Sequence, residues 1–495
     1  MIELNKIIGE LVRYSLKNNI IEKADEAWAT ASLMQVFEVD SFEEAELGEE
    51  REIHEILGDA LEYAYDAGLI KSRGVVSFDL FDTKIMGVLM PRPSEVISKF
   101  RRLYSEDPAL ATDYFYKLSV ASNYIRADRV SKDLKWKTSS EYGDIHISIN
   151  LSKPEKDPNA IALAKNLPQT DFPKCALCHE NEGFAGTLTK AARQTLRQIP
   201  FNMAGEDWYL QYSPYVYYNE HCIALSAEHK PMSINRDSFR KLLGFVTEFP
   251  HYFIGSNADL PIVGGSILSH DHMQGGRYVF PMELAGVKKD ISFLGFEDIK
   301  AAIVKWPMSV IRLSGENKDR LVELSDKILK AWRGYTDEDA EIYAETSGEP
   351  HNTITPIARR RGDMFELDLV LRNNLTTVDH PLGLYHPHSE HHNIKKENIG
   401  LIEVMGLAIL PARLKAEMAE LCENILSDKE IEGIHKAWFE SFKDKYIFTP
   451  ENTESYLRAE IGNTFVNVLR DAGVYKDTDD GLNKFLKFIK YVNNN

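Results

Sequence analysis

The sequence predicts an α+β protein with helical extensions at both ends. Apolar residues recur at helical spacing near the start, between Leu4 and Val12, and again near the end. Between Cys175 and Glu283, short strand-like runs surround one helical stretch, which is typical of an α+β fold. Two His-x-His segments, at residues 270–272 and 386–388, are further compatible with a duplicated α+β unit.

The chain divides into four predicted parts. Residues 1–72 form a helical extension and residues 426–495 a helical tail. Residues 73–290 form a first half that contains a Cys-x-x-Cys pair and a His-x-His-x-Gln motif, and residues 291–425 form a second half rich in histidine. The junction between the two halves falls within residues 235–290.

The expected elements follow from local patterns, taken in chain order. A capping box at Ser41 and Glu44 predicts a helix start, and Pro154 and Pro158 predict a loop. Strands are expected at residues 144–150, 208–218, 222–226, 251–257, 277–280 and 367–371, with a further sheet segment within 399–410. Helices are expected at residues 233–249, over most of 300–345, and at 414–445 and 452–492.

Composition limits the class of protein. The 495 residues are 43% hydrophobic and carry a net charge of -18, which argues against a general nucleic-acid surface. The first residues show no basic region followed by an apolar run, and no stretch has the apolar length of a membrane span. We therefore expect a cytoplasmic protein without membrane partners. Its four cysteines are too few for a disulfide scaffold.

The most informative segment is Gly264–Gly276, which has His270, His272 and Gln274 at alternate positions between paired glycines. In an extended chain these three side chains share one face. A neutral imidazole such as His272 can displace a leaving group from phosphorus, and the Gln274 amide can donate hydrogen bonds to the phosphate oxygens. The glycines, including Gly275 and Gly276, allow backbone amides to approach a phosphate closely.

Cys175 and Cys178 have the spacing of a zinc knuckle, although the pair is also compatible with two ordinary thiols. His229 and His270 are available to complete a tetrahedral set. A site with four protein ligands is closed and structural, so zinc here would orient the loop that carries His272 without activating water.

Several stretches resemble the galactose-1-phosphate uridylyltransferase family in its longer bacterial branch. They are the segments at residues 78–83, 149–157, 175–178, 224–229, 269–274 and 351–356, so that the resemblance covers roughly residues 75–425. It implies a duplicated histidine-triad-like fold of antiparallel sheets, in which Gln274 replaces the third histidine of the triad. It also implies a homodimer that exchanges UMP between UDP-glucose and galactose 1-phosphate through a uridylyl-His272 intermediate.

The resemblance further implies site residues. Gln274 is expected to bind the uridylyl phosphate, and Cys175, Cys178, His229 and His270 are expected to bind zinc. Candidates for diphosphate binding are Arg126, Arg129, Gly275, Gly276, Arg277 and the run Arg359 to Arg361. A second metal site would use His386, His388 and Glu283. The sequence departs from the shorter family members at Asp271, where they have proline.

Two other functions are compatible with these residues. One is a histidine-triad nucleotide hydrolase or phosphorylase, which would pass the histidine adduct to water or phosphate. Gln274 argues against hydrolysis, because an amide cannot act as a base for water. The other is a non-enzymatic zinc-binding scaffold, in which the cysteines and histidines only hold the fold together.

Overall fold

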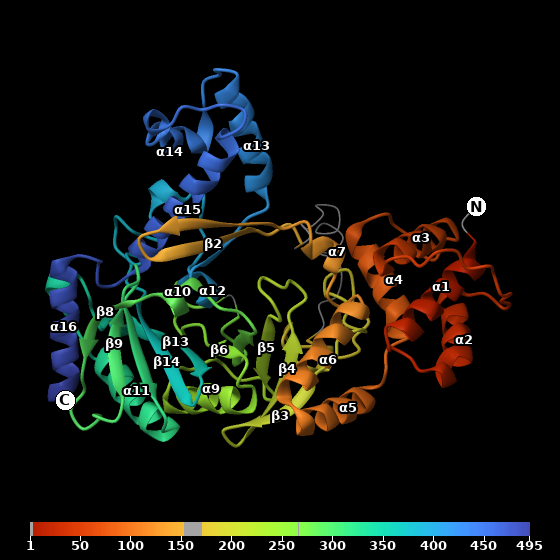
Figure 1. Ribbon diagram of the computed structural model, residues 1–495, viewed down its shortest axis with the longest axis horizontal. Helices are drawn as coiled ribbons and strands as arrows, with labels where there is room; N and C mark the ends of the chain where they lie inside the picture. The colour runs from red at the N-terminus through yellow and green to blue at the C-terminus, as the bar shows by residue number, and fades with distance from the viewer. Residues whose placement is uncertain (1–2, 153–170, 266) are drawn as a thin grey trace.

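The computed structural model describes residues 3–152, 171–265 and 267–495. A mixed sheet system forms its centre, with helices at both ends of the chain (Figure 1). The N-terminal helices lie at one end of the long axis and α16 Asp479–Asn494 at the other. The helices α13 Arg413–Leu426 and α14 Lys436–Glu440 project from the body of the molecule, while α15 Thr453–Ala472 connects them to it. The α+β class with helical extensions is therefore confirmed.

The N-terminal region is helical over the described part of residues 1–72, as predicted, and the helices continue beyond the prediction as far as residue 130. Its helices are α1 Leu4–Lys17, α2 Glu26–Phe37, α3 Ile53–Asp66, α4 Val75–Gly87, α5 Pro93–Glu106, α6 Pro108–Ala121 and α7 Ala127–Val130. The expected helix start at Ser41 is wrong, because the segment around it is irregular and α3 begins after Glu52. Closely spaced carboxylates disfavour a helix there, and Arg13 instead donates to the carbonyl oxygens of Gly48 and Glu49.

The main sheet has ten antiparallel strands in the order β3-β4-β5-β7-β6-β13-β14-β10-β9-β8. The strands of the first half are β3 Ile199–Met203, β4 Glu206–Tyr212, β5 Cys222–Ser226, β6 Phe253–Gly255 and β7 His272–Gly276. Those of the second are β8 Val287–Ile291, β9 Lys300–Val304, β10 Val310–Gly315, β13 Asn352–Arg361 and β14 Met364–Asn373. The two predicted halves thus share one continuous sheet.

The strand order demonstrates the duplication. Each half has three consecutive strands, then a helix, then two strands that join the sheet in reversed order. The helices are α9 Arg236–Glu248 in the first half and α11 Lys318–Arg333 in the second. The halves meet where β6 pairs with β13, through Ile254 opposite Ala358 and Gly255 opposite Ile357.

The two faces of the first half have different roles. Trp208, Ala224 and Met273 belong to one buried apolar cluster together with Leu242 of α9. Because side chains alternate along a strand, His272 and Gln274 point to the opposite face. The main sheet therefore buries one face under α9 and α11 and presents the motif on the other.

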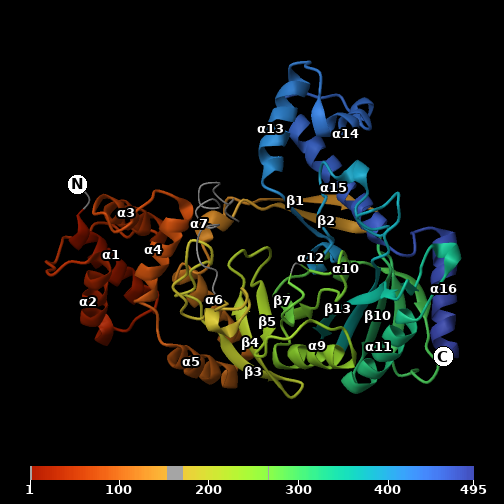
Figure 2. The same ribbon diagram turned by 180° about the vertical axis from the view of Figure 1, so that it is seen from behind.

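A smaller sheet, of order β1-β2-β15, lies beside the main one (Figure 2). It consists of β1 Leu134–Ser140, β2 Gly143–Ile149 and β15 Leu407–Leu410, with β15 parallel to β2. The remaining elements are α10 Pro281–Leu284, the hairpin β11 Glu345–Thr346 and β12 Glu349–Pro350, α12 Leu401–Val404, α13 Arg413–Leu426, α14 Lys436–Glu440, α15 Thr453–Ala472 and α16 Asp479–Asn494. Among the described helices, none combines the length and apolar character needed to cross a bilayer.

Some predicted boundaries are wrong. The segment 300–345 begins with the strands β9 and β10 before α11, and residues 277–280 follow the strand β7 instead of forming one. In β9 every residue after the exposed Lys300 is buried and apolar, so the strand lacks the polar alternation that separates a strand from a helix in sequence. The loop expected around Pro154 and Pro158 lies outside the described residues.

Candidate active site

A cavity of about 620 Å³ opens beside β5 and β7, and His272 and Gln274 both line it. The loop residues Gly264 and Gly265 form part of its wall, and the segment around α12 forms another part. Other side chains that line it include Leu177, Tyr215, Tyr217, His221, Asn257, Asn398 and Glu403. The cavity therefore offers apolar, aromatic and hydrogen-bonding surfaces around the motif.

His272 is held in a defined tautomer. It is the first residue of β7 and lies opposite Leu225 of β5. Its Nδ1–H donates to the carbonyl oxygen of His270 at 2.8 Å, which leaves the lone pair on Nε2. Burial lowers the pKa of the His272 imidazole, so the neutral form is favoured. A neutral imidazole with a free Nε2 is the form that attacks phosphorus.

Gln274 lies two residues further along the same face, opposite Ile223. Its Oε1 is 3.0 Å from Nε2 of His221, the residue that precedes β5. Sequence reasoning missed His221, because the residue lies 53 positions before Gln274 and belongs to no motif. Only the strand register of β5 and β7 brings the two side chains together.

The four predicted metal ligands converge. One potential ligand atom from each of Cys175, Cys178, His229 and His270 lies within 4.8 Å of the others. Nδ1 of His270 is 3.3 Å from Sγ of Cys175, and Nδ1 of His229 is 3.1 Å from Sγ of Cys178. The group is able to hold a metal ion.

Hydrogen bonds from neighbouring residues orient these four potential ligands. Nε2–H of His270 donates to the carbonyl oxygen of Ser226 at 2.9 Å, which directs the free Nδ1 toward the sulfur atoms. Asn181, which the sequence prediction missed, donates from Nδ2 to the carbonyl oxygens of Cys175 at 2.8 Å and Cys178 at 2.9 Å. Burial raises the pKa of Cys178 to about 11, so metal binding must displace its proton.

The glycines after Gln274 serve strand packing. A Cβ atom on Gly275 would lie 2.6 Å from the carbonyl oxygen of Phe253. Gly276 has a φ of +151°, and a Cβ there would lie 2.6 Å from the carbonyl oxygen of Glu220. These two positions are constrained by neighbouring backbone, and neither lines the cavity.

The arginines predicted to bind the diphosphate lie outside the cavity lining and pair with carboxylates. Arg126 donates to Asp82 at 2.8 Å and Arg129 to Asp79 at 2.9 Å. Arg277 lies 2.9 Å from Asp113. The run Arg359 to Arg361 is in β13, where Arg359 pairs with Asp368 at 2.8 Å and Arg361 with Glu366 at 3.0 Å, while Arg360 stacks on Phe365.

The expected second metal site is not assembled. Glu283 of α10 faces Arg359 and Arg361 of β13, with 3.6 Å to each guanidinium. Nε2 of His386 is 3.1 Å from Oδ1 of Asn398, and Nδ1 of His388 is 3.5 Å from Asp471. Among the described residues, one group alone meets the geometry of a metal site. It consists of Cys175, Cys178, His229 and His270 and is called the Cys175 group below.

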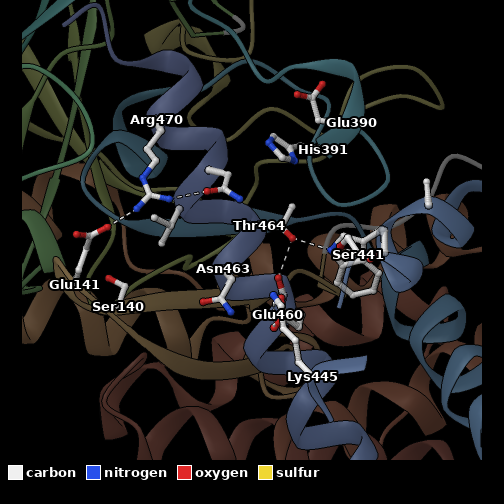
Figure 3. Close-up of a pocket in the computed structure, with 14 residues that line it drawn as sticks. Ser140, Glu141, Glu390, His391, Ser441, Lys445, Glu460, Asn463, Thr464 and Arg470 are labelled. Atoms are coloured by element: carbon white, nitrogen blue, oxygen red, sulfur yellow. Dashed lines mark hydrogen bonds and ion pairs between the residues drawn. The ribbon is translucent and has the colours of Figure 1, made fainter. Parts of the chain in front are cut away.

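A second cavity, of about 570 Å³, lies along α15 next to α14 and the turn between β1 and β2 (Figure 3). Polar groups in its wall pair with one another: Arg470 contacts Glu141, and Nε1 of Trp438 donates to Oγ1 of Thr464 at 2.8 Å. None of the motif residues lines it. The cavity beside β7 is therefore the candidate active site.

Comparison with known proteins gives one family. Residues 39–231 match the model for the N-terminal domain of galactose-1-phosphate uridyl transferase, and residues 245–440 match its C-terminal domain. A galactose-1-phosphate uridylyltransferase of Fusobacterium nucleatum is 52% identical and one of Clostridium acetobutylicum 53% identical, each over 99% of this chain and at least 99% of its own length. Among solved structures, yeast Ap4A phosphorylase Apa2 matches with a TM-score of 0.35 and 12% identity, over 63% of this chain and 90% of its own. The chain belongs to the galactose-1-phosphate uridyl transferase family.

Proposed function

We propose that the protein transfers UMP from UDP-glucose to galactose 1-phosphate through a covalent intermediate on His272. The observation that carries this proposal is the tautomer of His272: its Nδ1–H donates to the carbonyl oxygen of His270, so the lone pair is on Nε2, and the residue lines a cavity that Gln274 also lines. The full-length identity to galactose-1-phosphate uridylyltransferases supports the choice of substrates.

In the first half-reaction, Nε2 of His272 attacks the α-phosphorus of UDP-glucose. A bond forms between nitrogen and phosphorus, and the bond to the bridging oxygen breaks, so that glucose 1-phosphate leaves with that oxygen. The modified imidazole becomes a cation, because its Nδ1 proton is retained. The carbonyl oxygen of His270, 2.8 Å from Nδ1, stabilises this positive charge. Gln274 donates to the non-bridging oxygens as negative charge develops on them.

In the second half-reaction, a phosphate oxygen of galactose 1-phosphate attacks the same phosphorus. The nitrogen–phosphorus bond breaks, UDP-galactose forms, and His272 returns to its neutral tautomer. The two sugar phosphates bind in turn, so the cavity has to accept only one of them at a time. Its polar residues Asn257, Asn398 and Glu403 provide hydrogen-bonding groups for a sugar or a ribose.

The Cys175 group fits a zinc ion by its donor set, two thiols and two imidazole nitrogens. Zinc bound by four protein ligands supplies structural restraint without an open position for water. His270 connects this group to the nucleophile, because its ring faces the sulfur atoms and its carbonyl oxygen accepts the proton of His272. Membership of the family supports the further proposal of a homodimer with a cytoplasmic location.

A single assay tests the function. Incubation with UDP-glucose should give UDP-galactose only when galactose 1-phosphate is present. With UDP-glucose but no acceptor, the enzyme should release one equivalent of glucose 1-phosphate per chain. Steady release of UMP without an acceptor would instead identify a hydrolase, and release of UDP upon addition of phosphate would identify a phosphorylase. Full activity of a His272→Ala variant would favour the non-enzymatic role for the motif.

A further inference from the structure

His221 is a buried histidine that the mechanism above does not use. It is 2% exposed and lines the cavity that contains His272 and Gln274. It precedes β5, in which Ile223 lies opposite Gln274 and Leu225 opposite His272. Because side chains alternate along a strand, His221 shares the face of Ile223 and lies diagonal to Gln274. Its Nε2 is 3.0 Å from Oε1 of Gln274.

The ring of His221 is fixed by aromatic neighbours. Its centroid is 4.5 Å from that of Tyr218 and 5.5 Å from that of Tyr217. Tyr218 is itself anchored, because its hydroxyl donates to the carbonyl oxygen of Gly275 at 3.1 Å. Burial lowers the pKa of His221 to about 4, so the imidazole is neutral near neutral pH. A neutral imidazole has one N–H donor and one acceptor nitrogen.

The position of that proton follows from the surroundings of the other nitrogen. Nδ1 of His221 is buried and has no hydrogen-bond partner within the described part of the chain. A buried N–H without an acceptor is rarer and more costly than an unsatisfied lone pair. The proton therefore resides on Nε2, which donates to Oε1 of Gln274. With its oxygen engaged in this way, the Gln274 amide has its NH2 group available to the cavity.

We propose that His221 is a positioning residue that orients the Gln274 amide, so that its NH2 group donates to the phosphoryl group transferred to His272. This inference rests on the proposed function, because it assigns Gln274 to the transferred phosphate. Without this hydrogen bond, the glutamine amide could turn either its oxygen or its nitrogen toward the cavity, and an amide oxygen there would repel the phosphate oxygens. His221 removes that alternative before the substrate binds, which is how preorganised donors contribute to catalysis.

Two isosteric substitutions at His221 test the proposal. The amide nitrogen of glutamine occupies the place of Nε2, whereas that of asparagine occupies the place of Nδ1. We expect His221→Asn to slow single-turnover uridylylation by labelled UDP-glucose about 100-fold, the effect typical of a misplaced catalytic group, with KM for UDP-glucose nearly unchanged. His221→Gln should retain most of the rate. Circular dichroism and bound metal are measured for both variants to exclude misfolding.

A double-mutant cycle shows whether His221 acts through Gln274. In a Gln274→Ala background, His221→Asn should cause no further loss, because the group that it positions is absent. Equal rates for the Asn and Gln variants, or the same fold-loss with and without Gln274, would overturn the inference. A wild-type enzyme that forms no uridylyl adduct would instead overturn the proposed function and this inference with it.

Discussion

At the scale of single residues, the chemistry of the site depends on which nitrogen carries a proton. For His272 the carbonyl oxygen of His270 settles the tautomer, since it can only accept a hydrogen bond. For His221 the tautomer is settled by Nδ1, which has no hydrogen-bond partner among the described residues. The two imidazoles are therefore complementary: one exposes a lone pair to the cavity and the other donates a proton to Gln274.

Gln274→Ala is expected to reduce kcat for uridyl transfer by about 100-fold or more, the usual effect of removing one donor from a transition-state oxygen. KM for UDP-glucose should change far less, because the hydrogen bond strengthens as charge develops. The variant also leaves the N–H of His221 without its acceptor, which costs about 1–3 kcal/mol in unfolding free energy. Steady-state kinetics and urea unfolding measure the two effects separately. An unchanged kcat would remove Gln274 from the mechanism.

Residues that belong to a motif could be predicted, and their partners from other segments could not. The alternation of His270, His272 and Gln274 places the last two on one face, and the structure has them in one cavity. The ion pair of Arg126 could not be predicted, because Asp82, the carboxylate to which it donates, lies 44 positions earlier in α4. An arginine in a sequence is equally compatible with a phosphate and with a distant carboxylate.

At the scale of elements, β7 is positioned by its neighbours on both sides. It pairs with β5 through residues 272–275 and with β6 through residues 274–276. Gly275 allows close approach of the β6 backbone, because a Cβ there would lie 2.6 Å from the carbonyl oxygen of Phe253. A shift of this strand would move His272 and Gln274 together.

Gly275→Ala is therefore expected to lower the unfolding free energy by about 1–3 kcal/mol, the range for overpacking a buried site, and to reduce uridyl transfer. Gly286→Ala is the matched control, because a Cβ at Gly286 meets nothing within 4 Å. Urea unfolding and transfer assays on both variants provide the comparison. If the two variants behaved alike, the close approach at Gly275 would be irrelevant.

The loop that carries Cys175 and Cys178, two of the candidate metal ligands, is the second element that determines the site. We expect the purified protein to contain one zinc ion per chain, and Cys175→Ser to lose it, to lower Tm and to slow uridylylation, because the loop at His270 would no longer be restrained. Cys422→Ser is the control, since Cys422 is a cysteine outside the group. Elemental analysis measures the metal. Two metal ions per chain, with one lost upon replacement of His388, would contradict the assignment of a single site.

Elements with a clear period or a motif were predictable, whereas their pairing was not. The strand at residues 222–226 has its predicted bounds, and the helix predicted at 233–249 contains α9 Arg236–Glu248. The strand β9 was predicted as helix, because its run Ala301 to Val304 is apolar on both faces. The strand β7 was missed as an element since its glycines disfavour a strand. The predicted shared face holds for His272 and Gln274, whereas His270 precedes the strand and faces Cys175.

At the scale of the whole molecule, the two halves of the main sheet are duplicates, but the second His-x-His segment is not the counterpart of the first. The order β3-β4-β5-β7-β6 corresponds to β8-β9-β10-β14-β13. In the second half, β14 Met364–Asn373 occupies the place of β7, and it has no histidine. His386 and His388 follow that strand and match no position of the first motif. The described structure therefore has one copy of the His-x-His-x-Gln motif in two similar halves.

Stability should fall in mild acid because the fold buries neutral histidines. Folding lowers the pKa of His221 from 6.5 to about 4, so the unfolded chain takes up a proton first as the pH decreases. This contribution to the unfolding free energy is fully present above pH 6.5 and is lost progressively between pH 6.5 and 4, where the loss reaches about 3 kcal/mol. Urea unfolding of the wild type and His221→Gln across this range isolates it, because other groups titrate equally in both. Parallel stability curves would contradict a buried neutral His221.

The most direct test of the account is to locate the uridylyl group on the protein. Wild-type enzyme is incubated with labelled UDP-glucose at neutral pH without an acceptor, digested, and mapped by mass spectrometry. We predict one UMP per chain, on His272, that disappears upon addition of galactose 1-phosphate and never forms in His272→Ala. Label on any other residue, or transfer that requires both sugar phosphates bound at once without a labelled protein, would contradict the account.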